Sequence, residues 1–149
     1  NEREILANMT YPAAMFDQPW MAPTYGAPEY IVRDLYREEN GWWDRNPTTL
    51  HPASEAAAAA AVWSAIEPAR VLARARELAA AGEAQLALHV IDLIAGGPAG
   101  EPLAVEARRL KAELCRTLAQ TTSAFVSRSL YKTSANLLDQ DATSWTALG

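Results

Sequence analysis

The sequence is short of histidine and cysteine, the residues that most often bind zinc. Its 149 residues include two histidines, His51 and His89, which lie on different segments. A zinc site needs three or four nitrogen, sulfur or carboxylate ligands, several of them usually closely spaced, and no H-x-H, H-E-x-x-H or C-x-x-C pattern is present. We therefore predict no metal site built from this chain alone, with His51 as a loop residue before Pro52 and His89 packed within a helix.

Patterns for nucleophilic catalysis and phosphate binding are missing as well. The single cysteine, Cys115, cannot form an internal disulfide, and between Leu114 and Arg116 it is interpreted as a small buried apolar residue. The serines at 123–134 have no G-x-S-x-G context, and the GGPAG segment at 96–100 is not followed by the Gly-Lys-Ser/Thr of a P-loop. We expect neither a catalytic centre nor a cofactor in this chain.

The chain also lacks a basic block and a long apolar run. Thirteen Lys and Arg against eighteen Asp and Glu give a net charge of −5, so the electrostatic term that drives nucleic-acid binding is missing. No apolar run reaches the length of about 18 residues that a membrane-spanning helix needs, and the N-terminus carries no signal-peptide pattern. Position 1 is Asn rather than Met, which is consistent with a piece excised from a longer protein. The cellular compartment stays open.

The residues that are present predict one all-α domain. The length is sufficient to bury a core without disulfides, and apolar residues recur at helical spacing from Ser54 onward. The predicted helices cover residues 55–66, 68–81, 83–95, 101–118 and 123–138. Their order resembles an array of antiparallel, tetratricopeptide-like helix pairs, although Glu83 and Ala84 stand where those repeats carry a large aromatic residue.

The helical pattern also makes predictions for single side chains. Trp63 is expected to anchor the alanine-rich first of these helices. The helix at 83–95 is apolar nearly all round, which favours a position between neighbouring helices. In the helix at 101–118 the stripe containing Leu110 and Leu114 is expected inside, and Arg108 outside.

The first 27 residues are expected to form an extended or turning strap. A short helix is predicted at 2–9, but Pro12, Pro19 and Pro23 exclude a long one. Two interpretations of the strap's apolar residues remain open. Phe16 and Trp20 anchor it to this domain's own core, or the strap crosses from a neighbouring domain.

The stretch from residue 25 to 52 concentrates aromatic and turn-forming residues. Pro28 can open a helix because its missing N–H would have no helical partner there, and Gly41 can end that helix in the left-handed conformation. Asp44 to Pro47 is predicted to be a turn.

This stretch resembles the start of the dimerisation domain of the metallo-β-lactamase-fold alkylsulfatases, zinc enzymes that hydrolyse long-chain alkyl sulfate esters. The matching residues are Tyr25, Gly26, Tyr36, Gly41, Trp42, Asp44, Asn46, Pro47, Leu50 and Pro52. The order of segments from Gly82 to Leu118 extends the resemblance. Near the C-terminus Arg128 and Tyr131 are kept, whereas the family's aromatic and asparagine are replaced by Ser127 and Ser129.

The resemblance implies an organisation and a partner. Residues 1–27 would link to an upstream metallo-β-lactamase-fold domain that holds the zinc, residues 28–139 would be the helical dimerisation domain, and residues 140–149 would be a tail or linker stub. Tyr25 would lie on the substrate side and help to hold a sulfate group. Three arginines in the stretch are interpreted as solvated charges that pair with Asp34, Glu38 and Asp44, or alternatively one of them reaches the anionic group with Tyr25. They are Arg33, Arg37 and Arg45.

Two functions therefore compete. The first is a homodimerisation module of an alkylsulfatase-like hydrolase, with an isologous interface for which Trp63, Leu110 and Leu114 are the candidates. The second is a stand-alone tetratricopeptide-like adaptor that binds a peptide or protein partner. A small-molecule-binding bundle is a third and weaker interpretation.

Overall fold

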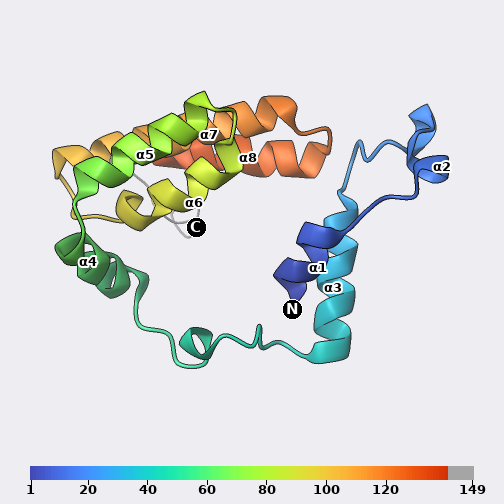
Figure 1. Ribbon diagram of the computed structural model, residues 1–149, viewed down its shortest axis with the longest axis horizontal. Helices are drawn as coiled ribbons and strands as arrows, with labels where there is room; N and C mark the ends of the chain where they lie inside the picture. Colours follow the sequence, from blue (N-terminus) through green and yellow to red (C-terminus); the bar gives the residue numbers. More distant parts are fainter. Residues whose placement is uncertain (141–149) are drawn as a thin grey trace. The chain divides into compact units, whose positions relative to one another are not determined.

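The computed structural model describes residues 1–140 (Figure 1). These residues form eight α-helices and two short 3-10 helices, and no strand occurs among them. The predicted all-α class is therefore confirmed. The sequence also predicts one apolar anchor, Trp145, in the tail at 140–149, and this residue lies outside the described residues.

The chain divides into two compact units. Unit 1 comprises Asn1–Pro52 together with Ser123–Ser127, and unit 2 comprises Ala53–Thr122 and the chain from Arg128 onward. A short segment from the C-terminal half of the sequence thus belongs with the N-terminal residues.

Unit 2 contains five of the eight α-helices, the last of which begins in unit 1. Pro68 and Pro102 stand at the first positions of two of them, where a missing N–H removes no helical hydrogen bond. The Ser54 side chain accepts a hydrogen bond from the Ala57 backbone N–H and caps the alanine-rich helix. The helices are α4 (Glu55–Ala65), α5 (Pro68–Ala80), α6 (Ala84–Ala95), α7 (Pro102–Thr121) and α8 (Phe125–Asp139).

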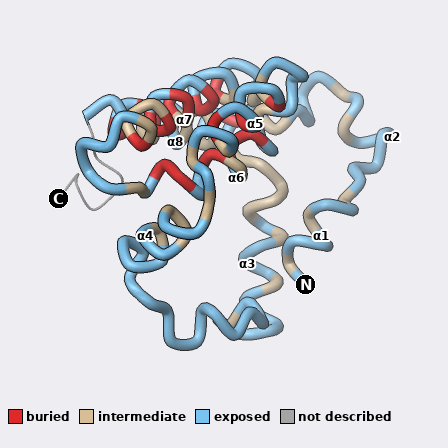
Figure 2. Tube along the Cα trace, turned by 60° about the vertical axis from the view of Figure 1, so that its left-hand side comes forward, coloured by how far each residue is buried: buried red, intermediate tan, exposed pale blue. Residues whose placement is uncertain are grey.

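The core of unit 2 lies where α6 packs against both α5 and α7. Figure 2 shows the buried residues gathered on these helices and on α8. Ile91 and Ile94 on α6 are the largest fully buried side chains, and Leu110 and Leu114 of α7 join the same cluster. The predicted inward stripe of α7 is therefore confirmed.

Trp63 of α4 is half-buried and packs against this core. Its ring lies over the loop after α6, where a Cβ atom at Gly97 would overlap it. The glycine is therefore required for a close approach of backbone to an aromatic ring, and the anchoring role predicted for Trp63 is confirmed.

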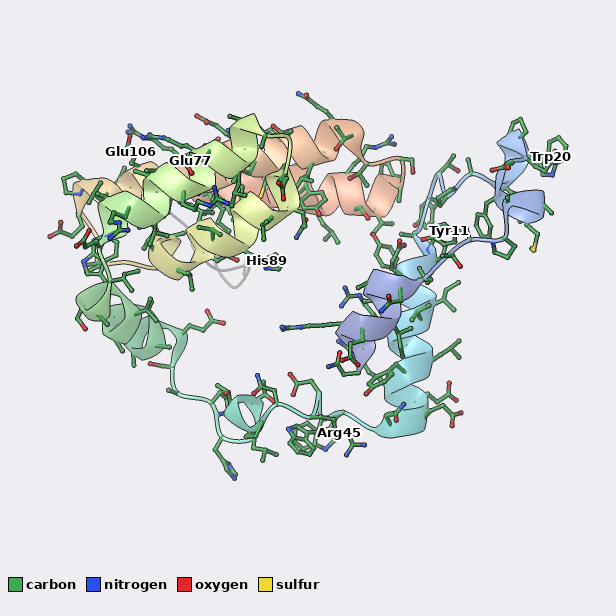
Figure 3. All side chains as sticks on the ribbon, viewed as in Figure 1. Tyr11, Trp20, Arg45, Glu77, His89 and Glu106 are labelled. Carbon is green, nitrogen blue, oxygen red and sulfur yellow. The ribbon has the colours of Figure 1, made fainter. Side chains whose placement is uncertain are left out.

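Three predictions about side chains in unit 2 are wrong. Arg108 is buried, and its guanidinium donates to the Ala95 carbonyl oxygen at 3.3 Å, because the α6 end leaves carbonyls without helical partners. Helix α6 is not enclosed on all sides, since Leu86 and Leu93 are exposed. His89, expected to be packed, is exposed on the same helix and projects from it in Figure 3.

Unit 1 is built from short elements around one longer helix. They are α1 (Glu2–Asn8), α2 (Ala13–Phe16), η1 (Pro19–Met21), α3 (Pro28–Asn40) and η2 (Pro47–Thr49). Helix α1 lies along α3 (Figure 1), where the Arg33 guanidinium donates to the Glu2 carboxylate at 2.7 Å. The predicted helices at 2–9 and from Pro28 are confirmed, whereas the region between them contains two short helical turns.

Unit 1 has almost no core of its own. Of the buried hydrophobic residues in the described chain, Ala124 alone belongs to this unit. Trp20 is 78% exposed and points away from the chain in Figure 3, so it does not anchor the segment to the core. Phe16 packs against Tyr11, with 4.7 Å between the ring centroids.

No single helix in residues 1–140 is both long and apolar enough to cross a membrane. Helices α4 and α5 reach that length and composition only together, with a bend of 99° between them.

Candidate functional site

Tyr25 lies in a corner that the chain builds against the start of α8. The Thr24 carbonyl accepts a hydrogen bond from the Phe125 N–H at 2.8 Å, and the Tyr25 carbonyl accepts one from the Val126 N–H at 2.9 Å. The first N–H groups of a helix have no partner within it, so these two carbonyls cap α8. The Ser123 hydroxyl adds a third link by donating to the Pro23 carbonyl at 3.3 Å.

The Tyr25 side chain is held by stacking and remains accessible. Its ring stacks on Phe125 with 6.0 Å between centroids and 16° between planes, a geometry that aromatic pairs favour. Tyr25 is nevertheless 73% exposed, so a group outside this chain can reach it. The neighbouring Gly26 has only ordinary contacts with Tyr30, whose hydroxyl is hydrogen-bonded to the Ser127 hydroxyl.

The remaining motif residues build the end of α3 and the turn that follows. Gly41 has a φ of 78°, and its N–H donates to the Arg37 carbonyl at 2.8 Å. The Asn46 side chain accepts from the Thr48 N–H and caps η2, of which Pro47 is the first residue. Tyr36 is half-buried in α3, and Trp42 is exposed.

Asp44 organises this turn through its carboxylate. One of its oxygens accepts from the Thr49 hydroxyl at 2.6 Å and from the Asn46 N–H at 2.9 Å. These hydrogen bonds, first from Thr49 and then from Asn46, lower the pKa of the Asp44 carboxyl below its usual value. The predicted turn from Asp44 to Pro47 is confirmed. The side chains of Asp44 and Asn46 both stabilise it by accepting hydrogen bonds.

The arginines of this region do not pair as predicted. Arg33 pairs with Glu2 of α1, and the Arg45 guanidinium lies 5.5 Å from the centre of the Trp43 ring while donating to the Asn40 carbonyl at 3.3 Å. Adjacent residues on a helix project in different directions, which is why Arg33 does not meet Asp34. Among the described residues, no hydrogen bond or ion pair joins Arg37 or Arg45 to Tyr25.

The candidate interface residues Trp63, Leu110 and Leu114 all have partners within unit 2. Leu110 is 9% exposed and Leu114 is 3% exposed, and Trp63 packs over Gly97. Their place in a dimer interface stays a prediction, and the structure gives each of them a role in the fold of one chain.

Metal-ligating and nucleophilic groups are scattered in the described part of the chain. Residues 1–140 hold no group of three or more His, Cys, Asp or Glu that could bind a metal ion, and His51 and His89 fall in different units. The donor set therefore does not fit zinc. Cys115 is buried, as predicted, and burial raises the pKa of its thiol, which disfavours the reactive thiolate.

An open groove of about 520 Å³ is the feature that the sequence did not indicate. It lies in unit 2, between the start of α6 and the end of α7. Its lining comprises Gly82, Glu83, Ala84, Gln85, Leu86, His89, Thr117, Leu118 and Thr121. Leu86 lines this groove. The sequence would have indicated the groove only if the apolar outer face of α6 had been interpreted as exposed.

Most of the exposed large hydrophobic side chains among residues 1–140 lie in unit 1, and such surface often marks an interaction site. The sequence model described as alkyl sulfatase dimerisation matches residues 1–141. Because this match covers nearly the whole chain, the chain belongs to the alkyl sulfatase dimerisation family, as the resemblance had indicated.

A solved structure supports the same assignment. The chain is similar to a double mutant of the sec-alkyl sulfatase PisA1, with a TM-score of 0.75 and 25% sequence identity over 93% of this chain. It spans only 22% of the length of that protein. A comparison with curated proteins gave no match.

Proposed function

We propose that this chain is the homodimerisation module of a zinc-dependent alkyl sulfatase, whose ester hydrolysis is carried by a metallo-β-lactamase-fold domain outside the chain. The match of residues 1–141 to the dimerisation family carries this proposal. A family described as dimerisation implies self-association, and the chain corresponds to about a fifth of a known alkyl sulfatase.

The physical character of unit 1 supports the proposal. A folded segment that buries almost none of its large apolar side chains gains little from the hydrophobic effect on its own. Such a segment is stabilised when another surface covers it, and contiguous exposed apolar surface usually marks an interaction site.

In this proposal residues 1–27 link to the upstream domain, residues 28–139 form the dimerisation domain, and residues 140–149 are a C-terminal tail or linker stub. The zinc belongs to the upstream domain. Neither nucleic acid nor a membrane is a proposed partner.

Tyr25 is the proposed contribution of this module to the substrate side. Its position is fixed by the cap on α8 and its side chain is exposed, so its hydroxyl can donate to an anionic sulfate oxygen. In the complete enzyme, Tyr25→Phe should raise KM for an alkyl sulfate several-fold while the dimer stays intact. An unchanged KM would remove Tyr25 from the substrate side.

A tetratricopeptide-like adaptor remains the second candidate, because consecutive helices pack in pairs and a groove opens between α6 and α7. An adaptor of that kind would bind a peptide there as a monomer.

The mass of the chain in solution separates the two candidates. Light scattering after gel filtration should give about twice the chain mass of 16.2 kDa if the module dimerises. Sequencing the reading frame upstream of Asn1 supplies the matching genetic test, since a His-x-His-x-Asp-His stretch is expected there. An unrelated upstream domain would count against the sulfatase assignment.

A further inference from the structure

Phe125 places an aromatic ring at the start of α8, directly against Tyr25. The ring centroids lie 6.0 Å apart and the ring planes are 16° from parallel, within the range of favourable aromatic stacking. Phe125 is 52% exposed and does not belong to the cluster of core residues. Its ring therefore adds little to the core, and the aromatic contact in which it takes part is the stack with Tyr25.

The main chain is fixed on both sides of this stack. The Thr24 carbonyl accepts a hydrogen bond from the Phe125 N–H at 2.8 Å, and the Tyr25 carbonyl accepts one from the Val126 N–H at 2.9 Å. These two hydrogen bonds involve the residues that carry the rings and their direct neighbours. The backbones of Tyr25 and Phe125 are therefore held next to each other whatever their side chains do.

The Tyr25 hydroxyl differs from most other tyrosine hydroxyls of the chain. Those of Tyr11, Tyr30 and Tyr131 are hydrogen-bonded to side chains. Among residues 1–140, the hydroxyls of Tyr25 and Tyr36 have no such partner, and of these two tyrosines only Tyr25 is exposed. The Tyr25 hydroxyl is therefore free to donate to a group outside the described chain.

Backbone hydrogen bonds alone do not fix the position of this hydroxyl. An exposed tyrosine can adopt several staggered rotamers about its Cα–Cβ bond, and each rotamer carries the hydroxyl to a different place. The stack on Phe125 favours one of these rotamers, because parallel, offset rings attract each other. The hydroxyl is then in place before a ligand arrives.

We propose that Phe125 is a positioning residue, which holds the Tyr25 hydroxyl where it can donate to a sulfate oxygen of the substrate. This inference rests on the proposed function, in which Tyr25 lies on the substrate side, and it names the residue that sets the position of Tyr25. A hydrogen bond to an anionic oxygen is stronger than one between neutral groups. A donor that is already ordered also loses less conformational freedom on binding.

Steady-state kinetics of the complete enzyme tests the role of Phe125. Phe125→Leu keeps the Tyr25 hydroxyl and removes its stacking partner. We expect KM for an alkyl sulfate to rise about two- to tenfold, the effect of having to order one side chain on binding, and kcat to stay unchanged. A merely structural role would instead reduce the amount of folded enzyme, which lowers the apparent kcat and leaves KM as it is.

Two further variants serve as controls. Phe125→Tyr keeps an aromatic ring in the stack and should keep the wild-type KM. Phe16→Leu removes a ring from the other aromatic pair of unit 1, that of Tyr11 and Phe16, and should also leave KM unchanged. Circular dichroism and light scattering should give the same helix content and mass for every variant. A rise in KM in Phe16→Leu equal to that in Phe125→Leu would overturn the positioning role.

A double variant shows whether Phe125 acts through Tyr25. Tyr25→Phe keeps the stack and removes the hydroxyl, so adding Phe125→Leu to it should raise KM no further, because no hydroxyl remains to be positioned. Effects that multiply in the double variant would overturn the inference. So would an unchanged KM in Phe125→Leu beside a raised KM in Tyr25→Phe. An unchanged KM in Tyr25→Phe would instead overturn the proposed place of Tyr25 on the substrate side, and the role of Phe125 with it.

Discussion

Gly97 is required because the Trp63 ring lies close to its backbone. A Cβ atom at this position would overlap the Trp63 ring, so Gly97→Ala must push α4 away from the core. We expect a loss of about 1–3 kcal/mol in the free energy of unfolding, the usual cost of overpacking, measured by urea denaturation. Gly26→Ala is the control, because its new methyl would meet Tyr30 at an ordinary 3.8 Å. Equal stabilities for both variants would contradict the packing of Trp63.

The hydrogen bonds to the Asp44 carboxylate should be detectable in the pKa of this group. Its pKa is lowered by the Thr49 hydroxyl and then by the Asn46 N–H, so the folded state holds the proton less tightly than the unfolded state does. The resulting stabilisation is present above the unfolded pKa of about 3.9 and is lost as the pH falls through the lower, folded value.

Nuclear magnetic resonance titration of the Asp44 carboxyl measures this shift directly. Thr49→Val should raise the Asp44 pKa toward its ordinary value, and Thr48→Val should leave it unchanged, because Thr48 contributes only its backbone N–H to the turn. An Asp44 pKa that is the same in Thr49→Val and in the wild-type chain would contradict the described turn geometry.

At the scale of elements, α7 should depend on its buried stripe far more than α6 depends on its exposed one. Leu114 is 3% exposed and Leu86 is 45% exposed. Leu114→Ala should cost about 2–5 kcal/mol in the free energy of unfolding through a cavity in the core. Leu86→Ala should cost much less in a dilute, monomeric sample, and chemical denaturation of both variants compares them. Similar losses would contradict the described orientation of α6 and α7.

The helices were predictable because their ends carry local signals. Ser54, Pro68 and Pro102 mark three starts, and the structure begins α4, α5 and α7 there. The turn after Gly41 followed in the same way from Asp44, Asn46 and Pro47. Such signals act within a few residues and do not depend on tertiary packing.

The environment of single side chains was less predictable. The apolar character of α6 could not tell a face against the core from a face left open, so Leu93 and His89 were placed inside. Arg108 was placed outside because charged residues usually are, yet the Ala95 carbonyl gives it a buried partner. The corner at Tyr25 depends on hydrogen bonds to residues a hundred positions away, which no local pattern encodes.

At the scale of the whole molecule, the two units differ in how much of their apolar surface is buried within the chain. Unit 2 buries most of its leucines and isoleucines within the chain, whereas unit 1 leaves most of its large apolar side chains exposed. The sequence predicted dimer surfaces on Trp63, Leu110 and Leu114, which serve unit 2 internally. Membership of the dimerisation family predicts that part of the exposed apolar surface of unit 1 is covered when two chains associate.

Sedimentation equilibrium of the 149-residue chain over a hundredfold range of concentration tests self-association most directly. We predict a mass that rises to twice 16.2 kDa and no further, as expected for a closed twofold dimer. A mass that stays at one chain throughout would contradict dimerisation and would favour the monomeric adaptor.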